Sequence, residues 1–324
     1  MPGSPEHLCD CCGATIAGAP NVLDDGRELC HRCQATGVDS QGATEALRDE
    51  VLRALDRLGF ALARPAPIRL VDAAEMARLT GQSWRPTTAK DARILGCYQR
   101  KRDAETIYIE SGQPRDRLLF VLAHESGHDW QSDNNPAYAL VPDDVREGFA
   151  QWLAFKLADG LRLGHLVAAE RARADVYGVT TRRFEALDAE AGIAELRWFA
   201  VAIGRARQSR LEKRLSHFGR ETVERELRTP YSNWQAAIDL ANDAQILERE
   251  GRPWAAEMAW RLAVEQWPWQ RWTSRCWRRR RGLNFLSILA RSVWSRPTKT
   301  LRRLKAWHAS GSTVSDVTRN VTTA

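Results

Sequence analysis

The chain has 324 residues, of which 44% are hydrophobic, and its formal net charge is +7 at pH 7. This hydrophobic content supports packed cores and excludes a wholly disordered protein, while the length suggests two or three domains. No apolar run approaches the roughly 20 residues that a membrane helix needs, and the amino terminus shows no signal peptide. We therefore expect a protein of the cytoplasm.

Residues 1–40 contain two Cys-x-x-Cys pairs with 17 residues between them. Each pair can form a tight knuckle, and Gly13 suits the turn after the first pair. A disulfide framework is disfavoured, because the count of seven Cys is odd and no signal peptide is present. The pairs therefore predict one closed structural zinc site, with Cys11 and His31 as bystanders and with the ligands Cys9, Cys12, Cys30 and Cys33. Such modules bind proteins or nucleic acid about as readily as they simply fold.

A linker helix and a small sheet are expected next. Thr44 to Gly59, within a linker of residues 41–60, has Leu47, Val51, Leu55 and Leu58 at helical spacing. Strands are predicted at Ile68–Val71, Leu95–Gln99 and Thr106–Ile109. We expect the last of these to present an edge to an extended peptide.

The segment from His124 to His128 reads His-Glu-Ser-Gly-His. On a helix, positions i and i+4 share one face, so the two imidazoles can bind one metal ion. Glu125 then faces a metal-bound water and is the candidate general base of a zinc hydrolase. The alternative is a histidine pair that serves only packing.

A catalytic zinc takes three protein ligands, and Glu147 is the candidate for the third. The next histidine, His165, lies too far downstream. A second helix is predicted from an Asp cap at Pro142-Asp143-Asp144 to Asp159-Gly160, after a loop at residues 131–136. This reversal would return Glu147 to the histidines, although it could be only a first-turn acid favoured by the helix dipole. Gln151, one turn later, could orient a ligand.

Several of these motifs, in order, resemble the peptidase domain of the plant LIM-domain peptidases that restrict organ growth, the DA-one family. The similar segments are residues 67–72, 107–115, 122–128 and 147–154. The resemblance implies zinc ligands His124, His128 and Glu147, with Glu125 as base. The chain departs from the family at Gly127, where a bulkier residue is usual, and at Asp129, where an uncharged one is usual. Both departures concern helix packing and substrate fit.

The expected fold is therefore α+β: a gluzincin-like peptidase domain at residues 61–165, with a small sheet and two metal-binding helices. It would follow a zinc ribbon or half of a LIM module and precede an all-α region at residues 166–310. The cofactors would be one catalytic and one structural Zn²⁺. A second donor for the developing oxyanion is often needed. By residue type alone, the candidates are Tyr98, Tyr138 and Tyr177.

Within the helical region, residues 237–268 resemble one tetratricopeptide repeat. Its signature positions are occupied by Ala244, Leu247, Gly251, Ala256, Trp260, Ala263 and Pro268. A generic helical hairpin explains the same residues equally well. The repeat interpretation implies a surface for a protein partner.

Residues 271–308 contain 12 Lys or Arg and no acid, with four Trp interleaved. This composition suits nucleic acid or an anionic membrane surface, or it belongs to a solvated basic helical face. Residues 311–324 are polar and expected to be disordered. Three functions remain open: a zinc metallopeptidase that hydrolyses a protein substrate, a DNA-associated or regulator-cleaving peptidase, and an inert zinc-stabilised adaptor. The retained Glu125 argues against the last, because an adaptor needs no base.

Overall fold

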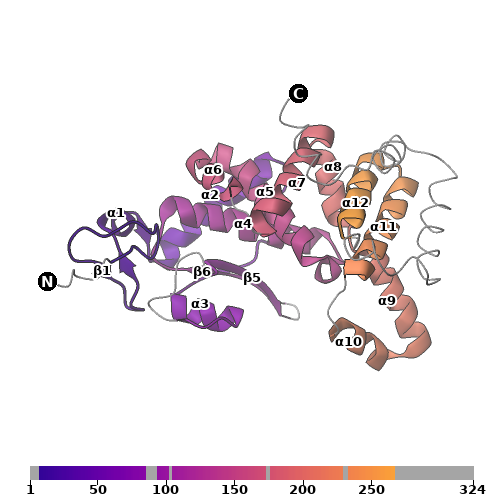
Figure 1. Ribbon diagram of the computed structural model, residues 1–324, viewed down its shortest axis with the longest axis horizontal. Coiled ribbons are helices and arrows are strands. Elements are labelled where there is room, and N and C mark those ends of the chain that lie inside the picture. The colour runs from indigo at the N-terminus through magenta and orange to yellow at the C-terminus, as the bar shows by residue number, and fades with distance from the viewer. Residues whose placement is uncertain (1–6, 85–92, 102–103, 173–175, 229–232, 267–324) are drawn as a thin grey trace, which may run out of the picture. The chain divides into compact units, whose positions relative to one another are not determined.

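The computed structural model describes residues 7–84, 93–101, 104–172, 176–228 and 233–266 (Figure 1). The chain divides into two compact units, Met1–Ile203 and Gly204–Ala324. The described part is mixed α+β, mostly helical with small sheets, as expected. The basic segment 271–308 and the tail 311–324 lie outside the described residues.

The first unit begins with the cysteine-rich module. An antiparallel pair, β1 (Asn21–Val22) and β2 (Glu28–Leu29), leads into the short helix α1 (His31–Ala35). The following strand β3 (Gly37–Val38) pairs with β7 (Gln113–Pro114), which directly precedes a long helix. This pairing joins the module to the rest of the unit through backbone hydrogen bonds.

The central sheet has three strands in the order β4–β6–β5. β4 (Ile68–Val71) is parallel to β6 (Ala104–Glu110), and β5 (Gly96–Lys101) is antiparallel to it. Figure 1 shows the sheet between α3 (Ala73–Thr80) and α4 (Arg115–Asn134). The three predicted strands are thus confirmed. The expected edge is wrong: β6 lies in the middle, paired on both sides, and among the described strands it is β4 and β5 that each have one unpaired side.

The predicted linker helix is α2 (Gln41–Arg57), which starts three residues earlier than expected because Ser40 caps it. The Ser40 hydroxyl accepts a hydrogen bond from the Ala43 amide, which satisfies one of the unpaired donors of the first turn. Its apolar face, including Leu47, Val51 and Leu55, is buried as the spacing predicts.

Helices α4 and α5 (Asp143–Gly160) cross in the middle of the first unit and bury almost all of their inner side chains. The expected loop at residues 131–136 is partly wrong, since α4 continues to Asn134. In the last turn of α4, Gln131 and Ser132 are buried and Asp133 and Asn134 are exposed, and Gln131 donates to the Ala200 carbonyl. The second helix begins at Asp143 with Pro142 as its cap, so the expected Asp cap lies one position inside the helix.

An aromatic cluster fills the space around this crossing. Its members are Phe60, Trp130, Phe149, Trp152 and Phe184, with neighbouring ring centroids 4.8 to 6.3 Å apart. The short helices α6 (Gly164–Arg171), α7 (Val176–Ala191) and α8 (Ile193–Ala202) complete the first unit, which therefore continues beyond residue 165. Burial of such large side chains stabilises the crossing on which the candidate site depends.

The second unit consists of helices in its described residues. They are α9 (Arg205–Phe218), α10 (Arg220–Arg228), α11 (Asn233–Arg249) and α12 (Pro253–Gln266). Helices α11 and α12 pack on each other as the hairpin expected at 237–268, with a turn at Gly251, whose φ is +73°. The small residues Ala244, Ala256 and Ala263 are buried, which lets the two helices approach closely.

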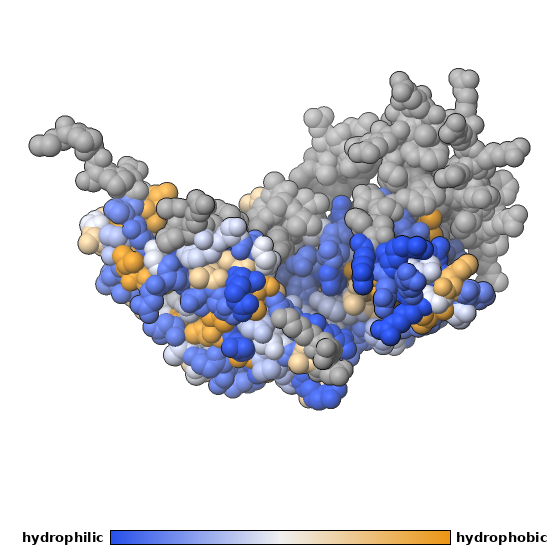
Figure 2. All heavy atoms as spheres, turned by 90° about the horizontal axis from the view of Figure 1, so that it is seen from below, coloured by the Kyte–Doolittle hydropathy of each residue, from blue (hydrophilic) through white to orange (hydrophobic). Residues whose placement is uncertain are grey.

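Hydrophobic side chains form small separate areas among hydrophilic ones on the face shown in Figure 2. Single exposed apolar residues are normal for a folded protein. None of the helices in the described part of the chain combines the length and hydrophobicity needed to span a bilayer.

Candidate metal centres

The first candidate centre lies where α4 and α5 cross. His124 and His128 stand one turn apart on α4, and Glu147 comes from the first turns of α5. The Nε2 atoms of the two histidines are 3.2 Å apart. Glu147 Oε2 lies 3.3 Å from His124 Nε2 and 3.5 Å from His128 Nε2. Three donor atoms from two helices thus converge on one point.

These distances match the donor set of a single tetrahedral ion. Ligands about 2.0–2.1 Å from zinc, at tetrahedral angles, are separated by about 3.3 Å. The three measured separations, 3.2 to 3.5 Å, bracket that value. The residues therefore fit a bound metal ion, and they form one of two such groups found among the described residues.

Gln151 holds His124 in the orientation that this site requires. Its Oε1 lies 2.8 Å from His124 Nδ1, and an amide oxygen only accepts hydrogen bonds. Nδ1 therefore carries the proton and donates, which leaves the lone pair of Nε2 for a metal. Gln151 is on the same helix as Glu147, one turn later, so α5 supplies both the third donor and the support for the first.

Glu125 points from α4 towards β5. Its Oε2 accepts a hydrogen bond of 2.7 Å from the backbone amide of Tyr98. β5 can approach this closely because position 96 is glycine: a Cβ there would lie 2.8 Å from Glu125 Oε1 and 2.4 Å from a methyl of Val121. The strand therefore fixes the carboxylate through its backbone.

The site is strongly coupled electrostatically. Burial raises the pKa of Glu125, although the neighbouring histidines oppose this shift. Burial would also raise the pKa of Glu147, but its hydrogen bonds with His124 and His128 outweigh burial and lower that pKa. Burial lowers the pKa of His124, while Glu147 and Glu125 more than compensate and raise it. Glu147 thus favours the charged form of His124, and hydrogen bonds with the two histidines favour the ionised form of Glu147.

The two departures from the DA-one pattern each have a structural role. Gly127 lies against α5, where a Cβ would be 2.9 Å from Ala150 Cα. Asp129 is buried and accepts a hydrogen bond of 2.9 Å from the Ala66 amide, ahead of β4. Burial raises the pKa of Asp129 to about 6, and the Ala66 hydrogen bond limits the shift. Gly127 permits a close helix crossing, and Asp129 joins α4 to the start of the sheet.

Of the three tyrosine candidates, Tyr138 lies beside His128, and Tyr98 packs against Tyr138. Tyr138 packs edge-on against His128, with ring centroids 6.5 Å apart, and against Tyr98, with ring centroids 6.0 Å apart. Burial raises the pKa of both phenols. Tyr177 lies on α7, and its side chain is outside the described residues.

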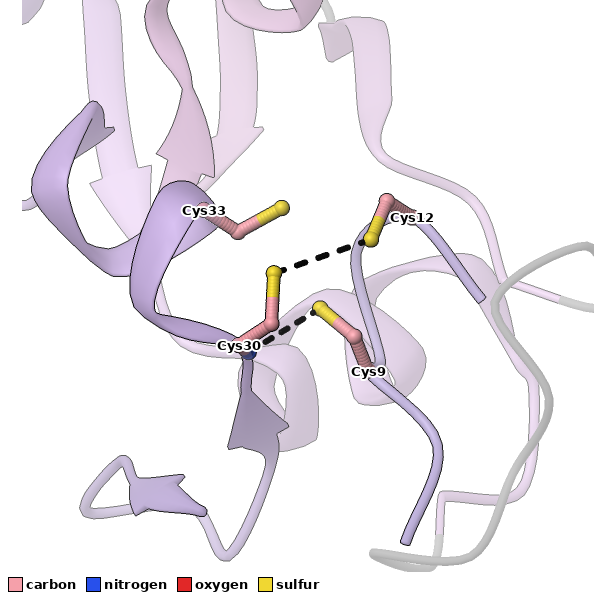
Figure 3. A group of neighbouring side chains, drawn as sticks. All are labelled: Cys9, Cys12, Cys30 and Cys33. Carbon is pink, nitrogen blue, oxygen red and sulfur yellow. Dashed lines mark hydrogen bonds between the residues drawn. The ribbon is translucent and has the colours of Figure 1, made fainter. Parts of the chain in front are cut away.

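The second candidate centre is the cysteine cluster shown in Figure 3. Cys9 and Cys12 come from a loop, Cys30 precedes α1 and Cys33 lies within it, and their sulfur atoms face one another. The four Sγ atoms lie within 4.8 Å of one another, and those of Cys12 and Cys30 are 3.8 Å apart. Tetrahedral zinc with Zn–S bonds of about 2.3 Å separates its sulfurs by about 3.8 Å. The cluster therefore fits a metal ion as well.

Backbone amides favour the anionic form of one member of this cluster, Cys9, whereas burial raises the pKa of Cys12 and of Cys33. Burial would raise the pKa of Cys9, but hydrogen bonds from the amides of Cys30, Cys12 and Cys11 lower it to about 7. Cys11 itself is turned away: its Sγ faces the Gly112 carbonyl at 3.6 Å, and burial raises its pKa to about 12. Neither Cys11 nor His31 belongs to the group of donor atoms.

A buried ionic network connects this module to the sheet. Arg27, in the turn between β1 and β2, donates to Glu110 at 2.6 Å and to the Ser111 carbonyl at 2.8 Å. Arg93 and Gln113 donate to the same carboxylate at 3.2 and 2.6 Å. Glu110 ends β6, five residues before α4 begins at Arg115, so the cysteine module contacts the segment that leads into the metal-binding helix.

Three residues near the two centres, Gly96, Arg27 and Glu110, were not predicted from the sequence. A glycine inside a strand is a known signal of close backbone approach, so Gly96 could have been flagged. Arg27 and Glu110 carry no such signal, because their pairing depends on how two distant segments fold together.

Comparisons with protein-family models, curated proteins and solved structures found no match to the chain.

Proposed function

We propose that the chain is a zinc-dependent peptidase in which His124, His128 and Glu147 hold the catalytic ion. The observation that carries this proposal is the convergence of their three donor atoms to within 3.2–3.5 Å, with the carboxylate of Glu125 next to His124. The motifs that resemble the DA-one peptidases support the same function. The substrate would be a protein or peptide.

A bound zinc ion would lower the pKa of a water ligand to about 7 and polarise a peptide carbonyl. The protein supplies the proton transfer: Glu125 would take a proton from the attacking water and deliver it to the leaving amine. Its carboxylate is held by the Tyr98 amide, which limits the orientations it can adopt. Gln151 fixes the tautomer of His124 throughout.

The cysteine cluster serves a different purpose in this proposal. Four sulfur donors fill a tetrahedral ion completely and leave no position for water, which is typical of a structural zinc site. Its ion would hold β2 and α1 in place, and thereby position Arg27 against Glu110.

The decisive experiment compares the wild-type protein with Glu125→Gln on a library of unstructured peptides, with cleavage sites read by mass spectrometry. We expect the wild type to cleave and Glu125→Gln to lose at least about a hundredfold in rate, since it lacks the base. Intact-mass analysis of both proteins detects self-cleavage. Identical cleavage patterns from the two proteins would refute the peptidase proposal.

Metal content provides a readout that does not depend on substrate. We expect about two zinc ions per chain in the wild type and in Glu125→Gln. His128→Ala and Cys9→Ser should each lose one ion. If the only ion found disappears with Cys9→Ser, the His124 site holds no metal, and the chain is better explained as an inert adaptor.

A further inference from the structure

A groove in the second unit is separate from both metal centres. It lies along α9 and α11, which pack side by side, and its cavity volume is about 500 Å³. Its lining residues recur every three or four positions on each helix, from Ala206 to His217 and from Asn242 to Arg249. At 1.5 Å per residue, these faces are about 10 to 16 Å long, the length of three to five residues of extended peptide.

The groove is lined by basic residues and by no acid. Two of its arginines, Arg210 and Arg214, are already paired, since both contact Glu226 and Arg210 also contacts Asp239. Lys213 and Arg249 form no ion pair with any described residue. The groove therefore presents positive charge that the described part of the unit does not neutralise.

Apolar surface accompanies this charge. Phe218, at the end of α9, is 68% exposed and lines the groove, as does Ile246 on α11. Leu215, one turn before Phe218, is 48% exposed. Burial of such a side chain stabilises a complex, so a partner gains by covering it. The groove thus combines two kinds of attraction in a small space.

We propose that this groove binds a short acidic segment of a partner protein, with an apolar side chain next to its carboxylates. The carboxylates would pair with Lys213 and Arg249, and the apolar side chain would pack on Phe218. Nucleic acid fits less well, because phosphate backbones bind through many cations and two unpaired ones would provide little affinity. The chain's own segment 271–308 has no acid and would be repelled.

The test measures binding by fluorescence anisotropy with the full-length protein. The probes are labelled peptides in which Leu or Phe stands at varied spacing from a pair of Glu, each with a twin that has Gln in place of Glu. We expect at least one acidic peptide to bind about tenfold or more tightly than its twin, and the affinity to fall with added salt.

Three variants locate the binding site. Lys213→Glu combined with Arg249→Glu should lower the affinity for the acidic peptide at least about tenfold. Phe218→Ser should lower it severalfold. Arg228→Glu is the control: it reverses one charge, where the double variant reverses two, on an exposed residue of α10 outside the groove, and should bind like the wild type. Circular dichroism verifies that each variant remains folded.

Other outcomes overturn the proposal. Equal affinity for the acidic peptides and their Gln twins would remove the role of the cations. Binding that survives the double substitution would place the site elsewhere. A labelled single-stranded oligonucleotide provides the last comparison. If it binds the wild type but not the double variant, and no acidic peptide binds, the groove is a nucleic-acid site instead.

Discussion

Gly127 and Ala150 face each other where α4 crosses α5, and a Cβ on Gly127 would lie only 2.9 Å from Ala150 Cα. The crossing distance is therefore set by the absence of a side chain. Since His124 and His128 are on α4 and Glu147 is on α5, the same distance determines whether the third donor reaches the other two.

Gly127→Ala should separate the helices, because the new methyl meets backbone rather than a movable side chain. We expect a loss of about 1–3 kcal/mol in the free energy of unfolding, together with weaker metal binding at this site. Urea unfolding and chelator competition measure the two effects. Gly42→Ala in α2 is the control, since nothing lies within 4 Å of its added Cβ. An unchanged metal affinity for Gly127→Ala would show that the crossing distance is not limiting.

Gly96→Ala should displace the carboxylate of Glu125 and leave metal binding unchanged. The added Cβ would lie 2.8 Å from Glu125 Oε1, so the carboxylate must shift away from the Tyr98 amide. A displacement near 1 Å at a reacting group can lower the rate about a hundredfold. We expect slower peptide cleavage with unchanged zinc content, measured by mass spectrometry. Full activity would mean that β5 does not position the base.

Gln151→Ala should lower the affinity for the ion bound by His124 about ten- to a hundredfold, because His124 loses the partner that fixes its tautomer. Gln151→Glu keeps an oxygen acceptor at the same position and should retain most of the affinity. Titration with a chromogenic zinc chelator ranks the three proteins. Equal affinities would assign Gln151 to packing alone.

The predictable parts of the site are those that local spacing determines. His124 and His128 share a helix face because they are four residues apart. Each Cys-x-x-Cys pair forms a knuckle from its own local sequence. Glu147 required one further step, the reversal between two helices. The reversal occurs as expected, although the loop begins at Asn135, four residues later than predicted, because α4 continues to Asn134.

The contacts that could not be predicted join residues far apart in sequence. Arg27 and Glu110 are 83 residues apart, and Ala66 and Asp129 are 63 apart. No periodicity of either partner encodes such a pairing. The order of strands is another example: alternation identifies β5 and β6, but only the fold determines that β6 lies between β4 and β5.

Arg27→Met tests the connection between the cysteine module and the sheet. The substitution leaves Glu110 buried with fewer partners, and breaking a buried pair in this way costs about 3–5 kcal/mol. Arg93 and Gln113 still donate to Glu110, but the buried carboxylate of Asp25 also loses its pair with Arg27, so we expect a loss within that range. Urea unfolding gives the value. Arg78→Met is the control, because its pair with Glu75 is exposed and should change stability by less than about 1 kcal/mol.

The stability of the second unit should depend on pH through Asp243. Its buried carboxyl accepts hydrogen bonds from the amides of Gly204 and Ala206 at the start of α9. Burial raises its pKa from 3.8 to about 7, although these hydrogen bonds and Arg205 oppose the shift and Asp239 adds to it. The folded unit therefore holds this proton more tightly than the unfolded chain does.

This unit should thus lose stability as pH rises from about 4 to about 7, and change little through this group at higher pH. Asp243→Asn removes the titration, so the stability difference between wild type and variant should shrink across the same window. Hydrogen exchange of the α9 and α11 amides measures the stability of this unit within the whole chain, once it is corrected for the intrinsic pH dependence of exchange. A constant difference from pH 4 to 7 would show that Asp243 is ionised throughout, with its two amide hydrogen bonds outweighing the cost of burial.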